Sequence, residues 1–311
     1  MRYLWLLLIA GCGGENGVLP PPVAVDPGAP PTNGLQVVLP MQRGFAPGSS
    51  NEICTWTDQV INHDVAVRSI EGFQSAGGHH LILFATQKHQ PAGTTRECID
   101  QDMATFQLIA ATAGGEGASH QVAAAPGNLA FRIAAGSQLV INHHYLNASP
   151  KPMDGASAMN VFFGDPKAEY TQSSWLVLLD TSLSLKPGTP SIDIHCTLPR
   201  DVRAWWIAPH MHRWGTRITI DRKSGGNTDR LFDVSPWGAD DAFHPPNMKR
   251  DPANAILFQA GDEFSIHCDW KIPNDGTPYT FGKEMCLMFA QTVDETKEGG
   301  LTCDQGKWTM N

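Results

Sequence analysis

A short histidine motif in the second half of the chain is the strongest local signal for metal chemistry. His210 and His212 are separated by one residue and follow an apolar run at 205–208. In a β-strand, residues two apart point to the same face with Cα atoms about 6.6 Å apart, so both imidazoles could bind one ion. Two solvent-facing or hydrogen-bonded histidines would give the same pattern. The motif therefore predicts a metal site only where further ligands join it.

Two other histidine pairs consist of adjacent residues. His79 and His80 follow two glycines, and His143 and His144 lie inside an apolar run. Because adjacent residues of a regular strand point to opposite faces, one histidine of each pair should face inward and the other outward. The glycines before His79 would permit a β-bulge or turn that redirects one imidazole. Without such a distortion, a structural role is the simpler interpretation of each pair.

A methionine offers a softer ligand. Met285 lies in the tripeptide Glu284-Met285-Cys286, directly before an apolar run. Most methionines fill gaps in cores. A thioether is, however, a soft ligand that favours Cu(I) over Zn(II). Together with His210 and His212, Met285 would complete a redox-capable copper site.

The motifs of several other functional classes are missing from the sequence. It contains no GxSxG, GxGxxG, GxxxxGK[ST] or HExxH pattern. The net charge is −9 and no dense basic run occurs, so nucleic acid is not expected as a partner. A zinc hydrolase is disfavoured because the thioether of Met285 is a poor zinc ligand.

Strands are the elements that must position these side chains. The chain has 30 glycines and 23 prolines among 311 residues, which disfavours long helices. Apolar runs between turn residues predict strands at 35–39, 81–85, 129–134, 138–145, 175–179, 202–208, 217–220, 255–258, 263–270 and 286–291. Their spacing favours an all-β fold of antiparallel β-sandwiches. The length favours two domains, and the polar stretch 164–169 is the expected boundary.

The N-terminus has the pattern of an export signal followed by a tether. Residues 1–11 combine an arginine with a short apolar segment and small residues, which predicts a signal peptide. Cys12 ends a run that resembles a bacterial lipobox, in which the cysteine is lipidated and anchors the protein to a membrane. Residues 12–34 are rich in glycine and proline and predict a semi-rigid tether. We therefore expect an exported, membrane-anchored lipoprotein of the periplasm or cell surface; the alternative is an ordinary signal peptide with a coincidental cysteine.

The remaining cysteines predict disulfides. If Cys12 is lipidated, an even number is left, namely Cys54, Cys98, Cys196, Cys268, Cys286 and Cys303. In an exported chain these would form up to three bridges. Spacing alone leaves the pairing open, but their distribution favours one bridge in the first half and two in the second.

In chain order, the motifs form one set: Cys54, His79-His80, Cys98, His144-Tyr145, Cys196, His210-x-His212, Cys268, Glu284-Met285-Cys286 and Cys303. This ordered set resembles the copper type II, ascorbate-dependent monooxygenases, a family that includes peptidylglycine α-hydroxylating monooxygenase and dopamine β-monooxygenase. The resemblance extends from about residue 35 to the C-terminus. Each motif alone is weak, whereas their order is specific.

The resemblance implies a fold and a set of ligands. The implied fold is two jelly-roll-type β-sandwich domains, at 35–168 and 169–311, that face each other across a cleft. The implied copper ligands are His79, His80 and His144 in the first domain and His210, His212 and Met285 in the second. The implied disulfides are Cys54–Cys98, Cys196–Cys303 and Cys268–Cys286.

The implied function is the hydroxylation of a C–H bond in a small organic substrate with O₂ and ascorbate or a similar reductant. The resemblance implies that O₂ reacts at the copper of His210, His212 and Met285, and that the three-imidazole copper supplies the second electron. The ligand chemistry agrees, since a thioether stabilises Cu(I) while imidazoles accept both oxidation states.

Three positions depart from the peptide-processing members of the family. Ala208, Leu287 and Phe289 stand where those members carry an arginine, an asparagine and a tyrosine. A buried substrate carboxylate would lose its charge-assisted hydrogen bonds here. We therefore expect a smaller or more apolar substrate than a peptide ending in glycine. The alternative function is an exported copper-binding or copper-delivery protein without oxygenase activity.

Overall fold

The regular secondary structure of the described residues consists almost entirely of β-strands. The computed structural model describes residues 24–99, 102, 105–114, 117–147, 149–238, 240–242 and 244–310. These residues contain 25 β-strands and a 3-10 turn at Pro252–Asn254, so the predicted all-β fold is confirmed. Within these ranges, no helix has the length and hydropathy needed to span a bilayer. The predicted signal peptide, Cys12 and most of the predicted tether lie outside the described residues.

The first half of the chain forms twelve strands. They are β1 (Gly34–Val38), β2 (Gln42–Phe45), β3 (Ser50–Val60), β4 (Val65–Gln74), β5 (Gly78–Thr86), β6 (Thr95–Glu97), β7 (Gln107–Ala113), β8 (Ser119–Ala124), β9 (Leu129–Ile133), β10 (Gln138–Leu146), β11 (Met153–Gly155) and β12 (Ser157–Phe163).

The second half supplies the other strands. They are β13 (Thr171–Leu179), β14 (Ser184–Leu185), β15 (Ser191–Thr197), β16 (Val202–Met211), β17 (Gly215–Ser224), β18 (Asn227–Val234), β19 (Met248–Lys249), β20 (Ile256–Phe258), β21 (Glu263–Trp270), β22 (Tyr279–Thr280), β23 (Cys286–Asp294), β24 (Leu301–Asp304) and β25 (Lys307–Met310).

The first half is a β-sandwich. One layer is the five-stranded sheet β6-β3-β10-β5-β7, and the other contains β1-β12-β4-β9 with β8 beside β4. Successive side chains of β5 and β10 point to opposite faces of the sheet. Leu81, Leu83 and Ile141 on one face are fully buried and pack in the same core as Ile70 and Val161 of the second layer. The opposite face of β5 and β10 carries the polar residues His80, Asn142 and His144 beside a smaller apolar cluster that includes Phe84 and Val140. The disulfide Cys54–Cys98 ties β3 to the segment after β6.

The second half is also a β-sandwich, and disulfides join its two layers. The sheet β15-β21-β17-β18 packs against the layer that contains β13, β23 and β16. Two disulfides, Cys196–Cys303 and Cys268–Cys286, each connect the two layers. All three bridges have the pairing that the family resemblance implies. Such bridges stabilise a fold mainly by restricting its unfolded chain.

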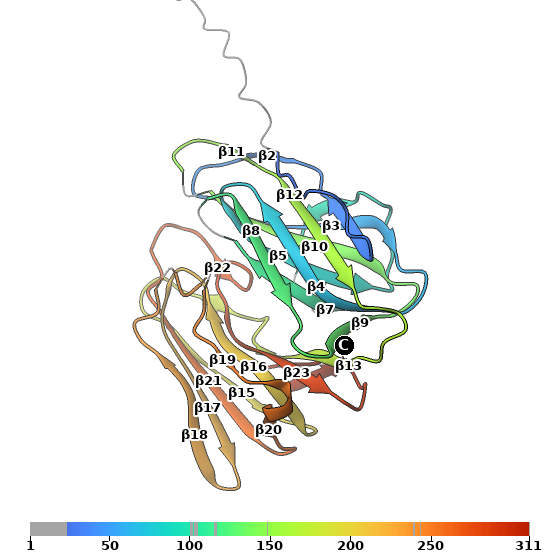
Figure 1. Cartoon of the computed structure of the whole chain (residues 1–311). Coiled ribbons are helices and arrows are strands. Elements are labelled where there is room, and N and C mark those ends of the chain that lie inside the picture. Colours follow the sequence, from blue (N-terminus) through green and yellow to red (C-terminus); the bar gives the residue numbers. More distant parts are fainter. Residues whose placement is uncertain are drawn as a thin grey trace, which may run out of the picture.

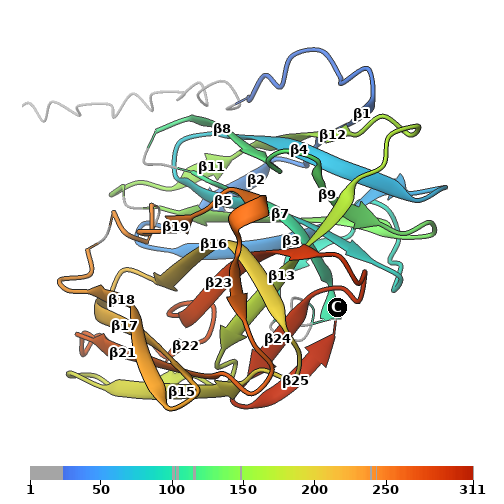
Figure 2. The same cartoon turned by 60° about the horizontal axis from the view of Figure 1, so that its bottom comes forward.

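The two halves share one continuous sheet (Figures 1 and 2). Strand β9 pairs in parallel with β13, with Leu129 opposite Thr171, and this contact joins both inner layers into a twelve-stranded sheet. The crossing segment lies between the end of β12 and the start of β13, at the polar stretch noted in the sequence. Trp175 and Leu287 from the second half belong to the same apolar cluster as the core of the first. The halves are therefore packed against each other.

Candidate metal centre

His79 and His80 both reach the site because β5 is irregular at this point. Strand β10 pairs His144 with His80 and then Tyr145 with Gly78, so His79 is the extra residue of a bulge. Gly77, directly before it, adopts a φ of +81°, which favours glycine. The bulge that the sequence permits is therefore present.

Three imidazoles converge at this bulge. The candidate ligand nitrogens of His79, His80 and His144 all lie within 4.8 Å of one another. Their ring centroids are 4.9–5.1 Å apart, and His79 and His144 are 4% and 1% exposed. We call these residues the imidazole triad. Three imidazoles at this spacing are a ligand set suited to copper or zinc.

Hydrogen bonds show which nitrogen atoms of the triad are left for a metal. Nε2 of His144 bonds the hydroxyl of Ser50 at 2.8 Å, while its buried Nδ1 has no hydrogen-bond partner. Nε2 of His80 donates to Oδ1 of Asn142 at 3.1 Å, which leaves Nδ1 of that ring as the acceptor. A buried nitrogen without a partner is costly, and a bound cation would satisfy it. The residues present therefore fit a metal ion.

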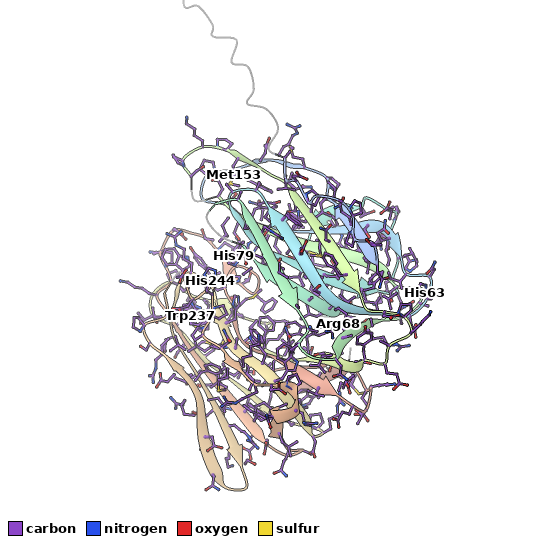
Figure 3. The ribbon with its side chains drawn as sticks, in the orientation of Figure 1. His63, Arg68, His79, Met153, Trp237 and His244 are labelled. Atoms are coloured by element: carbon purple, nitrogen blue, oxygen red, sulfur yellow. A yellow bond between two sulfur atoms is a disulfide. The ribbon has the colours of Figure 1, made fainter. Side chains whose placement is uncertain are left out.

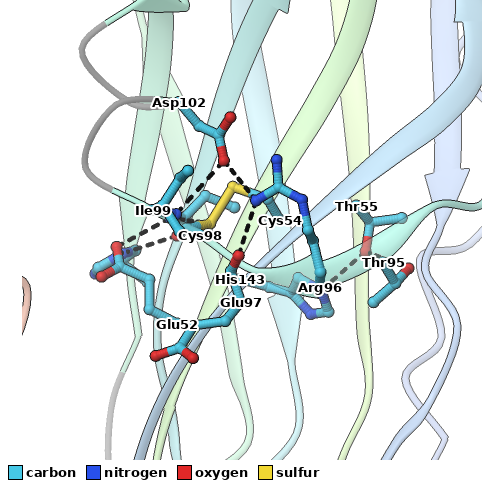
Figure 4. Close-up of a disulfide and its surroundings, with 12 residues drawn as sticks. Glu52, Cys54, Thr55, Thr95, Arg96, Glu97, Cys98, Ile99, Asp102 and His143 are labelled. Atoms are coloured by element: carbon cyan, nitrogen blue, oxygen red, sulfur yellow. Dashed lines mark hydrogen bonds and ion pairs between the residues drawn. A yellow bond between two sulfur atoms is a disulfide. The ribbon is translucent and has the colours of Figure 1, made fainter. Parts of the chain in front are cut away.

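His143 does not join the triad. Its Nε2 lies 3.1 Å from the hydroxyl of Thr55 (Figure 4). Its ring contacts that of Tyr145, two residues further along the same face of the strand. His144 points to the other face, so the expected inward and outward alternation of this pair is confirmed.

The second ligand set lies where β16 meets β23. The antiparallel register pairs His210 with Leu287 and Met211 with Cys286. Continued by one residue, it places Met285 beside His212. Nδ1 of His212 donates to the carbonyl of Lys283 at 3.1 Å, and its Nε2 is buried without a hydrogen-bond partner. The predicted ligands of the second site thus gather at one end of two paired strands.

The residues on both sides of Met285 hold it in place. Glu284 is fully buried and accepts hydrogen bonds from the backbone N–H of Trp214 at 2.8 Å and from Nε1 of Trp270 at 3.0 Å. Burial raises the pKa of Glu284 to about 7 despite these bonds. On the other side, Cys286 is fixed by its disulfide to Cys268. The thioether therefore projects from a segment anchored at both ends.

The two ligand sets meet at the junction of the halves. The ring of His212 lies 5.7 Å from that of His79 and 6.1 Å from that of His144, between centroids. A cavity of about 780 Å³ is lined by residues of both sets, including His80, His210 and Met285. His79 lies at this junction, and His244 lies near it on the side of the second half (Figure 3). The expected cleft between the halves is therefore this shared cavity.

The imidazoles of the centre are in the form that binds metals. Burial, with a contribution from His80, lowers the pKa of His144 to about 3. Burial likewise lowers the pKa values of His79, His210 and His212, and neighbouring imidazoles lower them further. These rings are neutral near pH 7, and neutral imidazole carries the lone pair that a metal needs.

Two polar residues of the centre, Glu52 and Asn142, were not predicted from the sequence. Glu52 lies 3.7 Å from Nε2 of His80, and Asn142 bonds both residues. Burial raises the pKa of Glu52, but its contact with His80, the nearby ring of His144 and the hydrogen bond from Asn142 outweigh burial and lower it to about 2. Asn142 stands two positions before His144, so strand alternation would have placed it on the same face.

An aromatic wall continues from the second ligand set into the cavity. The ring of His210 contacts Phe289 at 6.0 Å, Phe289 contacts Trp175 at 6.0 Å, and Trp175 contacts Trp206 at 6.3 Å, between centroids. All four side chains line the cavity. A substrate beside His210 would therefore meet aromatic and apolar surface.

Comparisons with known proteins do not indicate a function for this site. No protein-family model and no curated protein matches the chain. A solved structure of PNGF-II aligns with 84% of this chain and 66% of its own at 8% identity and a TM-score of 0.37. The major capsid protein P2 of bacteriophage PM2 aligns with 83% of this chain and 96% of its own at 10% identity and a TM-score of 0.30. Similarities this weak leave the function to be argued from the site.

Proposed function

We propose that the protein is an exported copper-dependent monooxygenase that hydroxylates a C–H bond of a small, apolar organic substrate, with O₂ and an ascorbate-like reductant. One observation carries the proposal. His79 and His80 of the imidazole triad and His210 and Met285 of the second set line one cavity that is otherwise largely apolar. The rings of His144 and His212 lie directly behind this wall, 4.9 Å from His79 and 5.1 Å from His210 between centroids. Unequal ligand sets are suited to unequal redox roles, which a storage or delivery protein would not require.

The ligand chemistry supports copper in both sites. Copper bound there would supply one-electron redox chemistry and the activation of O₂. The chain's own contribution is to hold Nδ1 of His144 and Nε2 of His212 free of other bonds and to keep both rings neutral. Carbonyl and hydroxyl partners fix the other nitrogen of each ring, which orients the ligands in advance.

The cavity wall supports an apolar substrate. Phe289 and Trp206 would bury its surface, and Leu287 offers no hydrogen bond to a carboxylate. Exclusion of water by this wall would protect reactive species formed next to His210. Neutral aromatic molecules and short lipids are the substrate classes that fit such a surface.

Export is supported by the three disulfides, which form and persist in oxidising compartments. The proposed anchor is the lipidated Cys12, and the proposed location is the periplasm or the cell surface. Ascorbate or a similar one-electron reductant is the proposed co-substrate.

The proposal is tested by metal analysis combined with ascorbate-dependent O₂ uptake. The mature protein would be loaded with copper and assayed against small aromatics, lipids and peptidylglycines. Uptake that is coupled to a hydroxylated product of a neutral substrate supports the proposal. Tight copper binding without coupled uptake would favour copper delivery, and faster turnover of a peptidylglycine would refute the substrate class.

A further inference from the structure

The carboxylate of Glu52 lies next to the imidazole triad, 3.7 Å from Nε2 of His80. Glu52 lies on β3 directly opposite His144 of β10, and its side chain is 11% exposed. Its backbone carbonyl accepts the N–H of Cys98 at 3.0 Å, so the segment that carries it is held next to the Cys54–Cys98 disulfide (Figure 4). The carboxylate is therefore a fixed part of the site.

Glu52 is connected to His80 through one amide. Nδ2 of Asn142 donates to Oε1 of Glu52 at 2.9 Å, and Oδ1 of Asn142 accepts from Nε2 of His80 at 3.1 Å. A carboxylate can only accept hydrogen bonds, so it selects the orientation of the amide. The amide oxygen in turn requires a proton on Nε2 of His80. Glu52 thus sets the tautomer in which Nδ1 of His80 is the unprotonated nitrogen that can bind a metal.

Glu52 has no strong cation beside it. Among the described residues, its ion-pair contact is with His80, at 3.7 Å, and no lysine or arginine pairs with it. A buried carboxylate is costly unless a positive charge compensates it. A divalent ion in the triad would supply that charge on the far side of the His80 ring.

We propose that Glu52 is a positioning residue for the triad: through Asn142 it fixes the tautomer of His80, and its charge favours a divalent over a monovalent ion there. This inference rests on the metal-binding part of the proposed function. A carboxylate behind a ligating imidazole raises the basicity of that ligand. Added negative charge stabilises the more highly charged ion, so Cu(II) gains more than Cu(I).

The test compares Cu(II) and Cu(I) affinities, measured by chelator competition on the full chain. Glu52→Gln should weaken Cu(II) binding at one site by about 10–100-fold, the range for residues behind metal ligands, and Cu(I) binding clearly less. Glu52→Asp keeps the charge and should retain part of the Cu(II) preference. Glu71→Gln is the matched control, because Glu71 faces His120, a histidine outside the site, at 3.9 Å.

The outcomes separate this inference from the proposed function. Equal loss of Cu(II) and Cu(I) affinity in Glu52→Gln would show a structural role and overturn the inference, as would no loss of either. An Asp variant as weak as the Gln variant would also overturn the role of the charge. A wild-type chain whose triad binds no copper would refute the proposed function itself. Oxygenase activity is not needed for any of these measurements.

Discussion

The imidazole rings of His79 and His212 lie 5.7 Å apart, although they come from opposite halves of the chain. His79 belongs to the bulge of β5, whereas His212 follows the end of β16. The parallel pairing of β9 with β13 and the shared apolar cluster hold the halves in this arrangement. The two candidate metal sites are therefore neighbours at the contact between the two halves.

The bulge that brings His79 into the triad should depend on Gly77. A Cβ added to Gly77 would lie 3.0 Å from the carbonyl oxygen of Leu146, at a φ of +81°. Gly77→Ala should therefore cost more than the roughly 1–2 kcal/mol of a left-handed residue and should reduce copper binding by the triad. Gly44→Ala is the matched control, since Gly44 has a φ of +71° and no atom within 4 Å of its Cβ. Urea unfolding and copper titration of both variants check this, and equal copper binding would contradict it.

Loss of the thioether should affect one site only. Met285→Ala should weaken Cu(I) retention at the second site and remove the sulfur ligand from the X-ray absorption spectrum, while the triad stays loaded. Met248→Ala removes a partly buried methionine elsewhere in the second half and is the control. Equal loss of copper from both sites in Met285→Ala would be incompatible with the assignment.

The aromatic wall should determine substrate preference. Phe289→Ala removes the ring between His210 and Trp175 and should lower kcat/KM for a neutral aromatic substrate by about 10–100-fold, the usual effect of lost apolar contacts in a pocket. The exposed Leu257 provides a control in Leu257→Ala. The comparison requires variants of equal melting temperature. Unchanged kcat/KM in Phe289→Ala would place the substrate elsewhere.

The free energy of unfolding should depend on pH through His267, which lies outside the candidate metal centre. Burial lowers the pKa of His267, but its bonds to Asp193 at 2.8 Å and to Asp269 at 3.1 Å prevail and raise it. A raised pKa means that the stabilisation is complete below about pH 6.5 and is lost as the pH rises through the folded-state value. His267→Asn should therefore reduce the free energy of unfolding more at about pH 6 than at about pH 9.

Denaturant unfolding at the two pH values measures this difference. His195→Asn, on the neighbouring strand, removes a histidine that bonds the hydroxyl of Ser265 instead of carboxylates, and it serves as the control. An effect of His267→Asn that is the same at both pH values would contradict the prediction.

The sequence was sufficient for the fold class and for many strands. Every strand predicted from an apolar run overlaps an observed strand, because such runs pack into one of the two cores. Strands with one polar face were missed, among them β3, which carries Glu52, and the exposed β18. Their alternation is broken by charged residues, so no apolar run marks them.

The site was only partly visible in the sequence. The triad required a bulge that the glycines before His79 permit but do not prove. The disulfide pairing came from the family resemblance, since cysteine spacing left it open. The contact between His79 and His212 depends on how two sandwiches pack, which no local pattern encodes. Asn142 was accessible from strand alternation, whereas Glu52 needed the pairing of β3 with β10.

A single-turnover experiment tests the central claim most directly. The copper-loaded chain is reduced, freed of excess reductant, and exposed to O₂ and a neutral aromatic substrate. Hydroxylation consumes two electrons, so two one-electron sites predict about one product molecule per chain, and His144→Ala should yield less than half of that. Full product from His144→Ala, or no product from a wild-type chain that holds both coppers, would contradict the account.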